Sequence, residues 1–288
     1  MEFVKTLTED KLILQGLIAE PNKKSDTAIL HIHGMAGNFW ENSFIKTMIE
    51  EYPKNGYTFL TVETRGSELM RWFNTEDEKQ VLLGNAHEIF EDCIYDIDAW
   101  INFLKYKGYK KIHLQGHSLG CSKIAYFKIL NNDKTIKSLI LISPSDMLGL
   151  ALNEKGLPKH NKLLSEAQTA IKKGEKDKLL DFFWDFALLS AKTYVNFFDK
   201  NAKTAIFNYY KPSLGFKTLE KINIPMLSIF GTNDDGIVTD PYESNNLIEK
   251  KAINCPKFTG QVIKGAQHDY EGFEKDVVNI VLAFLRKD

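Results

Sequence analysis

The sequence predicts an α/β fold in which a mostly parallel central sheet is flanked by helices and interrupted by a helical insertion. Short apolar runs alternate with helix-type segments through residues 12–142, and the alternation resumes through residues 225–286. Between them, residues 145–215 carry helical periodicity without an apolar strand. We therefore expect one core domain, residues 1–144 and 216–288, that carries a helical cap over residues 145–215.

The first half of the chain alternates strand and helix signals. Strands are expected at residues 12–18, 27–33, 57–62, 111–117 and 138–142, and helices at residues 44–52, 89–106 and 118–130. The strands are short apolar or alternating runs, and turn residues from Pro21 to Lys24 separate the first two. The long helix has Ile97, Ile101 and Leu104 at helical spacing. This alternation is typical of a parallel sheet that is covered on both faces.

The second half contains the insertion and the end of the core. Helices are expected at residues 163–172, 176–189, 192–208, 241–251 and 273–286, and strands at residues 225–230 and 261–263. Aromatic residues are dense between positions 182 and 198. We expect them to pack the cap onto the sheet, with an apolar roof over a substrate as the alternative.

Composition excludes several classes of function. Hydrophobic residues make up 43% of the chain and charged residues 26%, as in ordinary globular proteins. The net charge is -1, from 37 basic and 38 acidic residues without a long block of one sign, so neither nucleic acid nor an anionic membrane is an expected partner. The first residues lack a leader pattern and no stretch could span a membrane, so a soluble, cytoplasmic protein is expected. Three cysteines without a C-x-x-C pair indicate neither a disulfide framework nor a zinc site.

Residues 116–120 read GHSLG, a G-x-S-x-G pentapeptide between an expected strand and an expected helix. A sharp turn between strand and helix raises the serine hydroxyl clear of the backbone, and glycines relieve the crowding on both sides. This context favours Ser118 as a nucleophile over an ordinary surface turn. Cys121, three residues later, is interpreted as a small helix residue that packs on the sheet.

A serine nucleophile needs a base and an orienting acid, which in such a fold follow it along the chain in the order acid, then histidine. His268 lies between the last expected strand and the last expected helix, and it is the only histidine in the last hundred residues. The acid should follow the preceding strand, where Asp234 and Asp235 are adjacent. We prefer Asp234 and keep Asp235 as the alternative, because a one-residue slip in this glycine-containing loop decides which carboxylate faces the histidine. Asp146 is a third carboxylate, whose position favours a helix N-cap.

The same chemistry needs two backbone N–H groups that stabilise the oxyanion of the tetrahedral intermediate. One is expected from Leu119, the residue after the nucleophile. The other is expected from Met35, in the loop HGMAGN that follows the strand at residues 27–33. A glycine-rich loop also suits a phosphate, but neither G-x-G-x-x-G nor a P-loop lysine follows, which disfavours a nucleotide site.

Together these segments resemble the α/β-hydrolase superfamily, and the resemblance covers nearly the whole chain. It is carried by the HG motif at His33, the nucleophile elbow at residues 116–120, the G-x-x-D loop from Gly231 to Asp234 and the G-x-x-H segment that ends at His268. The resemblance implies the α/β-hydrolase fold and a triad of Ser118, His268 and an aspartate. One extra residue between Gly231 and Val238, relative to the commonest spacing, leaves the choice of aspartate open.

Two further segments refine this resemblance. Glu63 to Gly66 stand where many members carry D-x-R-G, so Arg65 is expected to brace the oxyanion loop, with a surface salt bridge as the alternative. The stretch HGMAGNFWEN and the helix segment at Glu91 resemble the bacterial DUF1749-type hydrolases and, less closely, the feruloyl and cinnamoyl esterase group. A serine at the elbow argues against haloalkane dehalogenases and epoxide hydrolases, which would need an aspartate there.

The leading hypothesis is a serine-dependent hydrolase of small acyl or aryl carboxylic esters that forms an acyl-enzyme, with neither a metal nor an organic cofactor. The same triad would serve a thioesterase or an acyltransferase, and the sequence does not separate these. A third hypothesis is a non-catalytic small-molecule receptor on the same fold. The expected partner is a small-molecule ester, and its contacts are expected from Phe39, Trp40 and His117.

Overall fold

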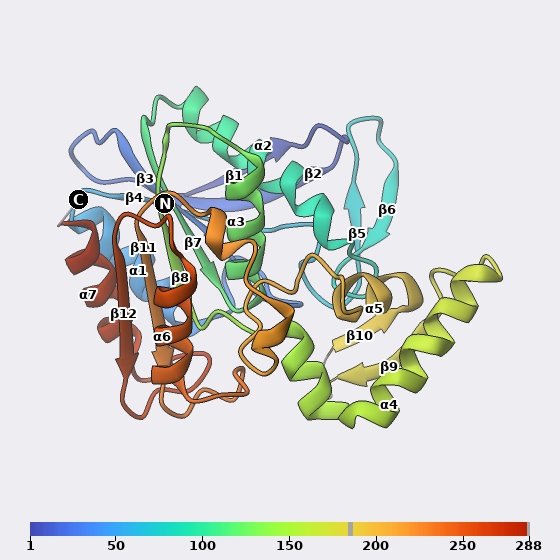
Figure 1. Cartoon of the computed structure of the whole chain (residues 1–288). Coiled ribbons are helices and arrows are strands. Elements are labelled where there is room, and N and C mark those ends of the chain that lie inside the picture. The colour runs from blue at the N-terminus through green and yellow to red at the C-terminus, as the bar shows by residue number, and fades with distance from the viewer. Residues whose placement is uncertain (184–186, 287–288) are drawn as a thin grey trace.

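An eight-stranded, mostly parallel sheet forms the centre of the molecule (Figure 1). The computed structural model describes residues 1–183 and 187–286. In spatial order the sheet contains β1 (Glu2–Leu7), β2 (Ile13–Ala19), β4 (Thr58–Val62), β3 (Thr27–Ile32), β7 (Lys111–His117), β8 (Ile136–Ile142), β11 (Met226–Gly231) and β12 (Phe258–Ile263). β2 pairs antiparallel with β1 and β4, and the other neighbours are parallel. The predicted fold class is confirmed.

Helices cover both faces of the sheet, as the alternation of strands and helices predicts. They are α1 (Ser43–Lys54), α2 (Cys93–Tyr106), α3 (Leu119–Leu130), α6 (Pro241–Lys251) and α7 (Glu274–Leu285). α1 and α7 pack against each other and share one core with Ile29 of β3 and Ile229 of β11. The other core joins residues of α2, α3 and α6 to Leu30 of β3. Because neighbouring residues of a strand face opposite sides, the two cores hold the sheet from both faces.

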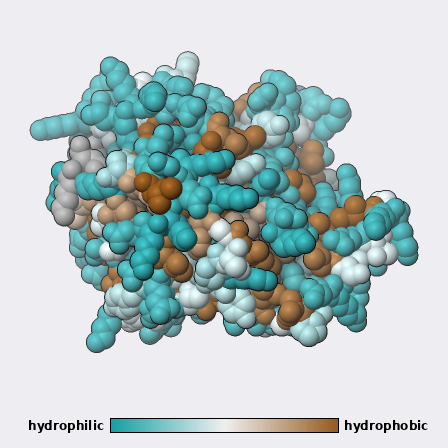
Figure 2. All heavy atoms as spheres, in the orientation of Figure 1, coloured by the Kyte–Doolittle hydropathy of each residue, from teal (hydrophilic) through white to brown (hydrophobic). Residues whose placement is uncertain are grey.

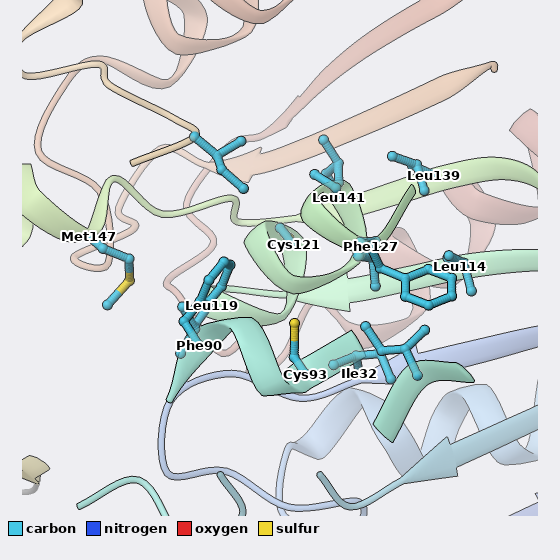
Figure 3. Close-up of a cluster of buried hydrophobic side chains, with 14 of the residues drawn as sticks. Ile32, Phe90, Cys93, Leu114, Leu119, Cys121, Phe127, Leu139, Leu141 and Met147 are labelled. Carbon is cyan, nitrogen blue, oxygen red and sulfur yellow. The ribbon is translucent and has the colours of Figure 1, made fainter. Parts of the chain in front are cut away.

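The core between α2, α3 and the sheet supports the chain immediately after β7. Figure 3 shows Leu119 and Cys121 of α3 in a cluster with Phe90, Leu141 and Met147. All five side chains are buried. Burial raises the pKa of the Cys121 thiol well above its usual range, so this cysteine is a packing residue, as expected.

The insertion between β8 and β11 contains two helices and a hairpin. α4 (Met147–Lys172) is longer than predicted and bends at Gly156, whose φ of 71° is non-helical and which stands two residues before Pro158. α5 (Ala191–Phe198) is shorter than predicted, and the hydroxyl of its N-cap Ser190 accepts a hydrogen bond from the first turn.

The helix predicted at residues 176–189 is wrong. β9 (Leu179–Phe183) and β10 (Ala187–Ser190) form an antiparallel pair there. The run is rich in leucine and phenylalanine, which suit a strand as well as a helix, so periodicity alone does not decide between them. Trp184 and Phe186, which belong to the aromatic segment, lie outside the described residues.

Several elements have no predicted counterpart. Strand β1 forms one edge of the sheet, and β5 (Arg71–Asn74) pairs with β6 (Gln80–Leu83) in a separate hairpin. Short 3-10 helices occupy Pro212–Leu214 and Leu219–Lys221, and a third, Phe90–Asp92, forms the start of the helix predicted at residues 89–106. Among the described helices, none is both long and apolar enough to cross a membrane. Figure 2 shows a mainly hydrophilic face on which apolar residues form small, separate patches.

Candidate active site

Ser118 occupies the sharp turn between β7 and α3. Its φ of 53° and ψ of -123° lie outside the regions that non-glycine residues prefer, so the backbone is strained here. The turn is so tight that a Cβ atom on Gly120 would lie 2.2 Å from the carbonyl oxygen of Ile32. The N–H of Ser118 donates to the carbonyl oxygen of Ile142 over 2.9 Å, which ties the serine to the end of β8.

His268 lies in the loop after β12 and meets the loop that follows β11. Its Nδ1 atom lies 2.7 Å from Oδ1 of Asp234, which is buried. Asp235 is exposed and lines the neighbouring cavity. A Cβ atom on Gly236 would lie 2.1 Å from the Nδ1 atom of His268, so the imidazole packs directly on this glycine. Of the two carboxylates considered, the structure brings Asp234 to the histidine.

This contact changes the protonation of both partners. Burial disfavours the imidazolium, but the hydrogen bond and negative charge of Asp234 outweigh it, and the pKa of His268 is raised above its usual value. Burial opposes ionisation of Asp234 too, but the hydrogen bond and charge of His268, with a hydrogen bond from Ser143, lower the pKa of this carboxyl. Asp234 therefore stays ionised next to an imidazole that binds a proton readily.

Two further donors hold Asp234 in place. The hydroxyl of Ser143 donates to Oδ2 over 2.5 Å, and the N–H of Gly236 donates to Oδ1 over 2.9 Å. Ser143 directly follows β8 with a φ of 49°, and the hydroxyl of Tyr270, whose own φ is 55°, lies 2.8 Å from the Ser143 hydroxyl. Together with Ser118, these are three strained non-glycine residues around one site, and such strain clusters at functional centres.

Ser118 and His268 line one cavity of about 660 Å³. It lies beyond the carboxyl ends of the parallel strands, where α/β sheets usually bind ligands. Met35 of the loop after β3 contributes one wall, and Met147 and Leu150 of α4 contribute another. Four acidic residues also line it: Glu41, Asp235, Asp269 and Glu271. Within the described part of the chain, no lysine or arginine does so.

The residues whose amides are expected to stabilise an oxyanion belong to the same region. Met35 lines the cavity, and Leu119 is the first residue of α3. The N–H groups of a first helical turn have no partner within the helix and lie at its positive end. A Cβ atom on Gly34 would lie 3.0 Å from the Cβ of Ser118, so the loop after β3 passes directly beside the serine.

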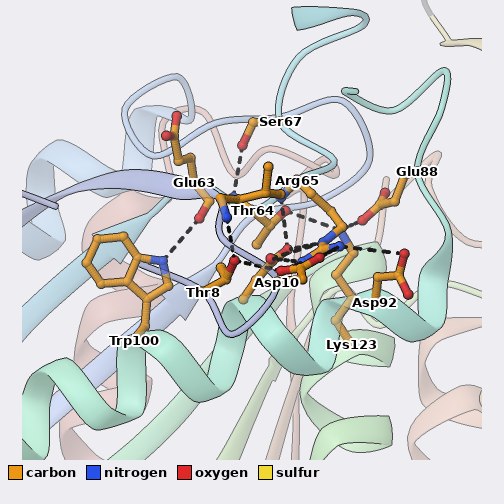
Figure 4. Close-up of polar contacts among 12 residues, drawn as sticks. Thr8, Asp10, Glu63, Thr64, Arg65, Ser67, Glu88, Asp92, Trp100 and Lys123 are labelled. Carbon is orange, nitrogen blue, oxygen red and sulfur yellow. Dashed lines mark hydrogen bonds and ion pairs between the residues drawn. The ribbon is translucent and has the colours of Figure 1, made fainter. Parts of the chain in front are cut away.

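A buried polar network stands behind this loop. Nδ1 of His33 lies 2.7 Å from the carbonyl oxygen of Gly34, and Nε2 lies 3.2 Å from the amide nitrogen of Thr64 and 2.8 Å from the hydroxyl of Ser67. Figure 4 shows Thr64 and Ser67 in this network. Burial, with the charge of Lys123, lowers the pKa of His33 to about 3. The neutral ring therefore donates through Nδ1 and accepts through Nε2, which joins the two loops.

Arg65 holds the turn that contains Thr64. Its guanidinium lies 2.9 Å from Asp96 of α2 and 2.9 Å from Asp10, and only 4% of the arginine side chain is exposed (Figure 4). The N–H of Arg65 also donates to Asp96 over 2.9 Å. Arg65 is therefore the buried centre of an ion-pair network in which Asp96 is buried and Asp10 and Asp92 are partly exposed. It supports the loop after β3 indirectly, because Thr64 lies between Arg65 and His33.

Lys123 of α3 and Glu88 form a second ion pair in this network. Their charged atoms lie 2.5 Å apart, and both side chains are fully buried. The Lys123 ammonium also lies 3.4 Å from the hydroxyl of Thr64. Burial raises the pKa of Glu88, although the charge of Lys123 opposes this. The pair is not predictable from the sequence pattern, because a charged residue on a helix ordinarily indicates a solvent-exposed face.

Two of the three residues predicted to contact a substrate do not line the cavity. The ring of Phe39 is buried, with centroids 5.9 Å from Phe3 and 4.5 Å from Trp40, and the side chain of Trp40 is half exposed. The unpredicted strand β1 supplies Phe3, and packing of aromatic rings against it directs Phe39 away from the site.

His117 does line the cavity, but its Nε2 atom forms a hydrogen bond within the protein. Nε2 of His117 lies 2.9 Å from the carbonyl oxygen of His268. Burial, followed by the charge of His268, lowers the pKa of His117 to about 4. The neutral ring therefore donates a hydrogen bond that holds the His268 loop against the end of β7.

The structure adds a group of residues after β8 that sequence reasoning missed. Ser143 contacts Asp234, and the hydroxyl of Ser145 lies 3.2 Å from the hydroxyl of Ser118. Asp146 caps α4, as expected, by accepting from the N–H of Gly149. No motif marks the two serines. The one available signal was their place after a parallel strand, at the edge of the sheet where sites form.

The sequence model described as alpha/beta hydrolase fold matches residues 27–270. No curated protein sequence matches the chain.

Several solved structures resemble this one over nearly its full length. Est1E from Butyrivibrio proteoclasticus, with ferulic acid bound, is 19% identical with a TM-score of 0.68, over 99% of this chain and 98% of Est1E. The siderophore hydrolase EstB from Aspergillus fumigatus is 15% identical with a TM-score of 0.74, over 100% and 97%. The esterase Pf2001 from Pyrococcus furiosus is 19% identical with a TM-score of 0.65, over 99% and 90%. At these identities the likeness establishes the fold.

Proposed function

Because the chain belongs to the alpha/beta hydrolase fold family, we propose that it is a serine hydrolase of small carboxylic esters. One observation carries the proposal: the strained Ser118 and the Asp234-paired His268 line the same cavity. Acyl transfer requires a nucleophile, a base and an orienting acid in this relation. Solved structures of the same fold include an esterase and a siderophore hydrolase, which supports the choice of esters.

In the proposed reaction, Oγ of Ser118 attacks the ester carbonyl carbon while its proton passes to Nε2 of His268. The carbonyl oxygen takes the electron pair of the broken π bond, and the amides of Met35 and Leu119 stabilise its charge. His268 then gives the proton to the leaving alcohol as the carbon–oxygen bond breaks, which leaves an acyl-enzyme. Water attacks this acyl group by the same steps and releases the acid. Asp234 orients the imidazole throughout.

The cavity supports a small substrate with an apolar acyl part. Its volume of about 660 Å³ is in the range of small-molecule sites. Met35, Met147 and Leu150 offer apolar surface beside Ser118. A short or medium acyl chain, or an aryl group, would bury its apolar area against these residues.

The same triad would act on thioesters or transfer the acyl group to another acceptor. Coenzyme A thioesters carry several phosphate charges, and four carboxylates line this cavity. Repulsion between like charges disfavours such substrates, so neutral or cationic esters are the better proposal. A non-catalytic receptor would use the same cavity without turnover.

Active-site labelling tests the proposal directly. The purified chain is treated with a fluorophosphonate probe and assayed with p-nitrophenyl acetate, and the Ser118→Ala variant serves as the blank. We expect stoichiometric labelling of Ser118 and a burst of p-nitrophenol. A panel of p-nitrophenyl esters of rising chain length, feruloyl esters and thioesters then defines the substrate class. Absence of both labelling and turnover in the folded protein would contradict the proposal and favour a receptor.

A further inference from the structure

The short turn between β8 and α4 contacts both the serine and the acid of the proposed triad. Ser143 donates to the carboxylate of Asp234, and two residues later Ser145 contacts Ser118. Ser145 is fully buried. One four-residue segment thus reaches both sides of the site, although no step of the proposed mechanism uses Ser145.

This turn is held firmly at both ends. At its start, the N–H of Ser143 donates to the carbonyl oxygen of Ile229 in β11 over 2.8 Å. At its end, the carboxylate of Asp146 accepts from the N–H of Gly149 over 2.8 Å and from the N–H of Tyr210 over 2.9 Å. The position of Ser145 is therefore set by the sheet and the insertion together, and its contact with Ser118 is not that of a freely rotating surface residue.

The hydroxyl of Ser145 has two partners and a single proton. Its oxygen lies 3.2 Å from Oγ of Ser118 and 3.2 Å from the carbonyl oxygen of Ser143. In one arrangement Ser145 donates to the carbonyl and accepts from Ser118, so the proton of Ser118 faces away from His268. In the other, Ser145 donates to Oγ of Ser118 and leaves the proton of Ser118 available for the base. Rotation of the two hydroxyl groups about their Cβ–Oγ bonds interconverts the two arrangements without displacing heavier atoms.

We infer that Ser145 is a further residue of the catalytic site, which holds Oγ of Ser118 in position and donates a hydrogen bond to it during attack. This inference rests on the function proposed above. As the proton of Ser118 passes to His268 and Oγ bonds to the carbonyl carbon, Oγ carries partial negative charge. The hydrogen bond from Ser145 stabilises that charge, and Ser145 keeps its own proton throughout. Hydrogen bonds to charged groups are worth more than those between neutral groups.

The test compares two buried serines, one in the turn after β8 and one in β8 itself. Ser145→Ala removes the hydroxyl beside Ser118, and Ser138→Ala removes a buried hydroxyl of β8 that lies 2.7 Å from Nδ1 of His113, away from the cavity. We expect Ser145→Ala to lower both kcat and the rate of fluorophosphonate labelling by about 10- to 100-fold with little change in KM. Ser138→Ala should label and turn over at nearly the wild-type rate.

Rescue and substitution variants separate a chemical role from a structural one. Ser145→Thr keeps the hydroxyl and should recover part of the lost labelling rate, and Ser145→Gly replaces the alanine variant if that one does not fold. If the folded variant without the hydroxyl is labelled within about threefold of the wild-type rate, the inference is overturned. The proposed function then still stands, because Ser118 is reactive. If wild-type Ser118 is not labelled, the proposed function fails, and the inference fails with it.

Discussion

Nδ1 of His268 and Oδ1 of Asp234 lie 2.7 Å apart, although the two residues come from loops that follow different strands. The adjacent Asp235 lines the cavity and is exposed. Of the two neighbouring carboxylates, one is therefore buried and paired with the imidazole, and the other is exposed at the cavity.

The two aspartates should differ sharply when each is replaced by asparagine. Asp234→Asn removes the charge that orients and stabilises the imidazole, and we expect kcat to fall by about 10⁴-fold. Asp235→Asn should keep most of the activity, because this side chain is exposed at the cavity. Steady-state hydrolysis of p-nitrophenyl acetate measures both variants. Equal losses in the two variants would mean that the acid is assigned wrongly.

The pH profile should report the raised pKa of His268. The base must be neutral to accept the proton of Ser118, so activity falls as pH drops through this pKa. Because Asp234 raises it above the ordinary value of 6.5, the acid limb of kcat/KM should have its midpoint above pH 6.5. In Asp234→Asn the burial of His268 is no longer outweighed, and the limb of the residual activity should move to lower pH. A wild-type midpoint below 6 would contradict the assignment.

Gly236 should tolerate no side chain, because its Cβ position is already occupied by the imidazole. A Cβ atom there would lie 2.1 Å from Nδ1 of His268, so Gly236→Ala must displace the ring. We expect a loss of kcat of at least about 100-fold with a smaller change in KM. Gly174→Ala is the control: its φ of 83° strains alanine, but nothing lies within 4 Å. That variant should lose about 1 kcal/mol of unfolding free energy and keep its activity.

The buried ion pair of Lys123 and Glu88 should contribute more to the unfolding free energy than to turnover. Lys123→Met leaves a carboxylate buried without its partner, and we expect a loss of about 3–5 kcal/mol in unfolding free energy, measured by urea denaturation. Adding Glu88→Gln removes the uncompensated charge and should recover part of that loss. Lys128→Met on the same helix removes a hydrogen bond to the carbonyl oxygen of Asn131, and it should cost less than about 1 kcal/mol. Similar losses for the two lysines would rule out a special role for the ion pair.

The charge of the cavity should favour cationic substrates. Glu41, Asp235, Asp269 and Glu271 line it. We therefore expect kcat/KM for the p-nitrophenyl ester of 4-(trimethylammonio)butyrate to exceed that for p-nitrophenyl hemiglutarate by about tenfold at low ionic strength. The ratio should shrink as salt is added and in the double variant Asp235→Asn, Glu271→Gln. A preference for the anionic ester would show that these carboxylates do not set the potential in the cavity.

Some parts of the site were predictable because their constraints are local. The elbow needs small residues on both sides of Ser118 and apolar runs before and after it, and all of these lie within a short stretch. The selection of Asp234 over Asp235 depends on distant groups as well. One donor to Asp234 is the N–H of Gly236, but another is the hydroxyl of Ser143, 91 residues earlier. No local pattern carries that information.

The same limit explains where tertiary contacts add to or alter what the sequence predicts. Residues 179–190 suit a helix or a hairpin, and only the pairing of β9 with β10 distinguishes them. Phe39 directly follows the loop after β3 in sequence, but its ring packs on Phe3, near the start of β1. His117, expected to touch a substrate, lines the cavity, and the partner of its Nε2 atom is the carbonyl oxygen of His268 on a distant loop. In each case a tertiary partner, absent from the local sequence, decides the outcome.

The order of the site residues along the chain has a consequence for synthesis. The elbow at Ser118 is complete long before translation reaches Asp234 and His268. α7 packs against α1, and Nε2 of His117 donates to the carbonyl oxygen of His268, so the loop of His268 is anchored by elements that are translated much earlier. While residues 234 and 268 are still untranslated, a nascent chain therefore carries the serine without its proposed acid and base.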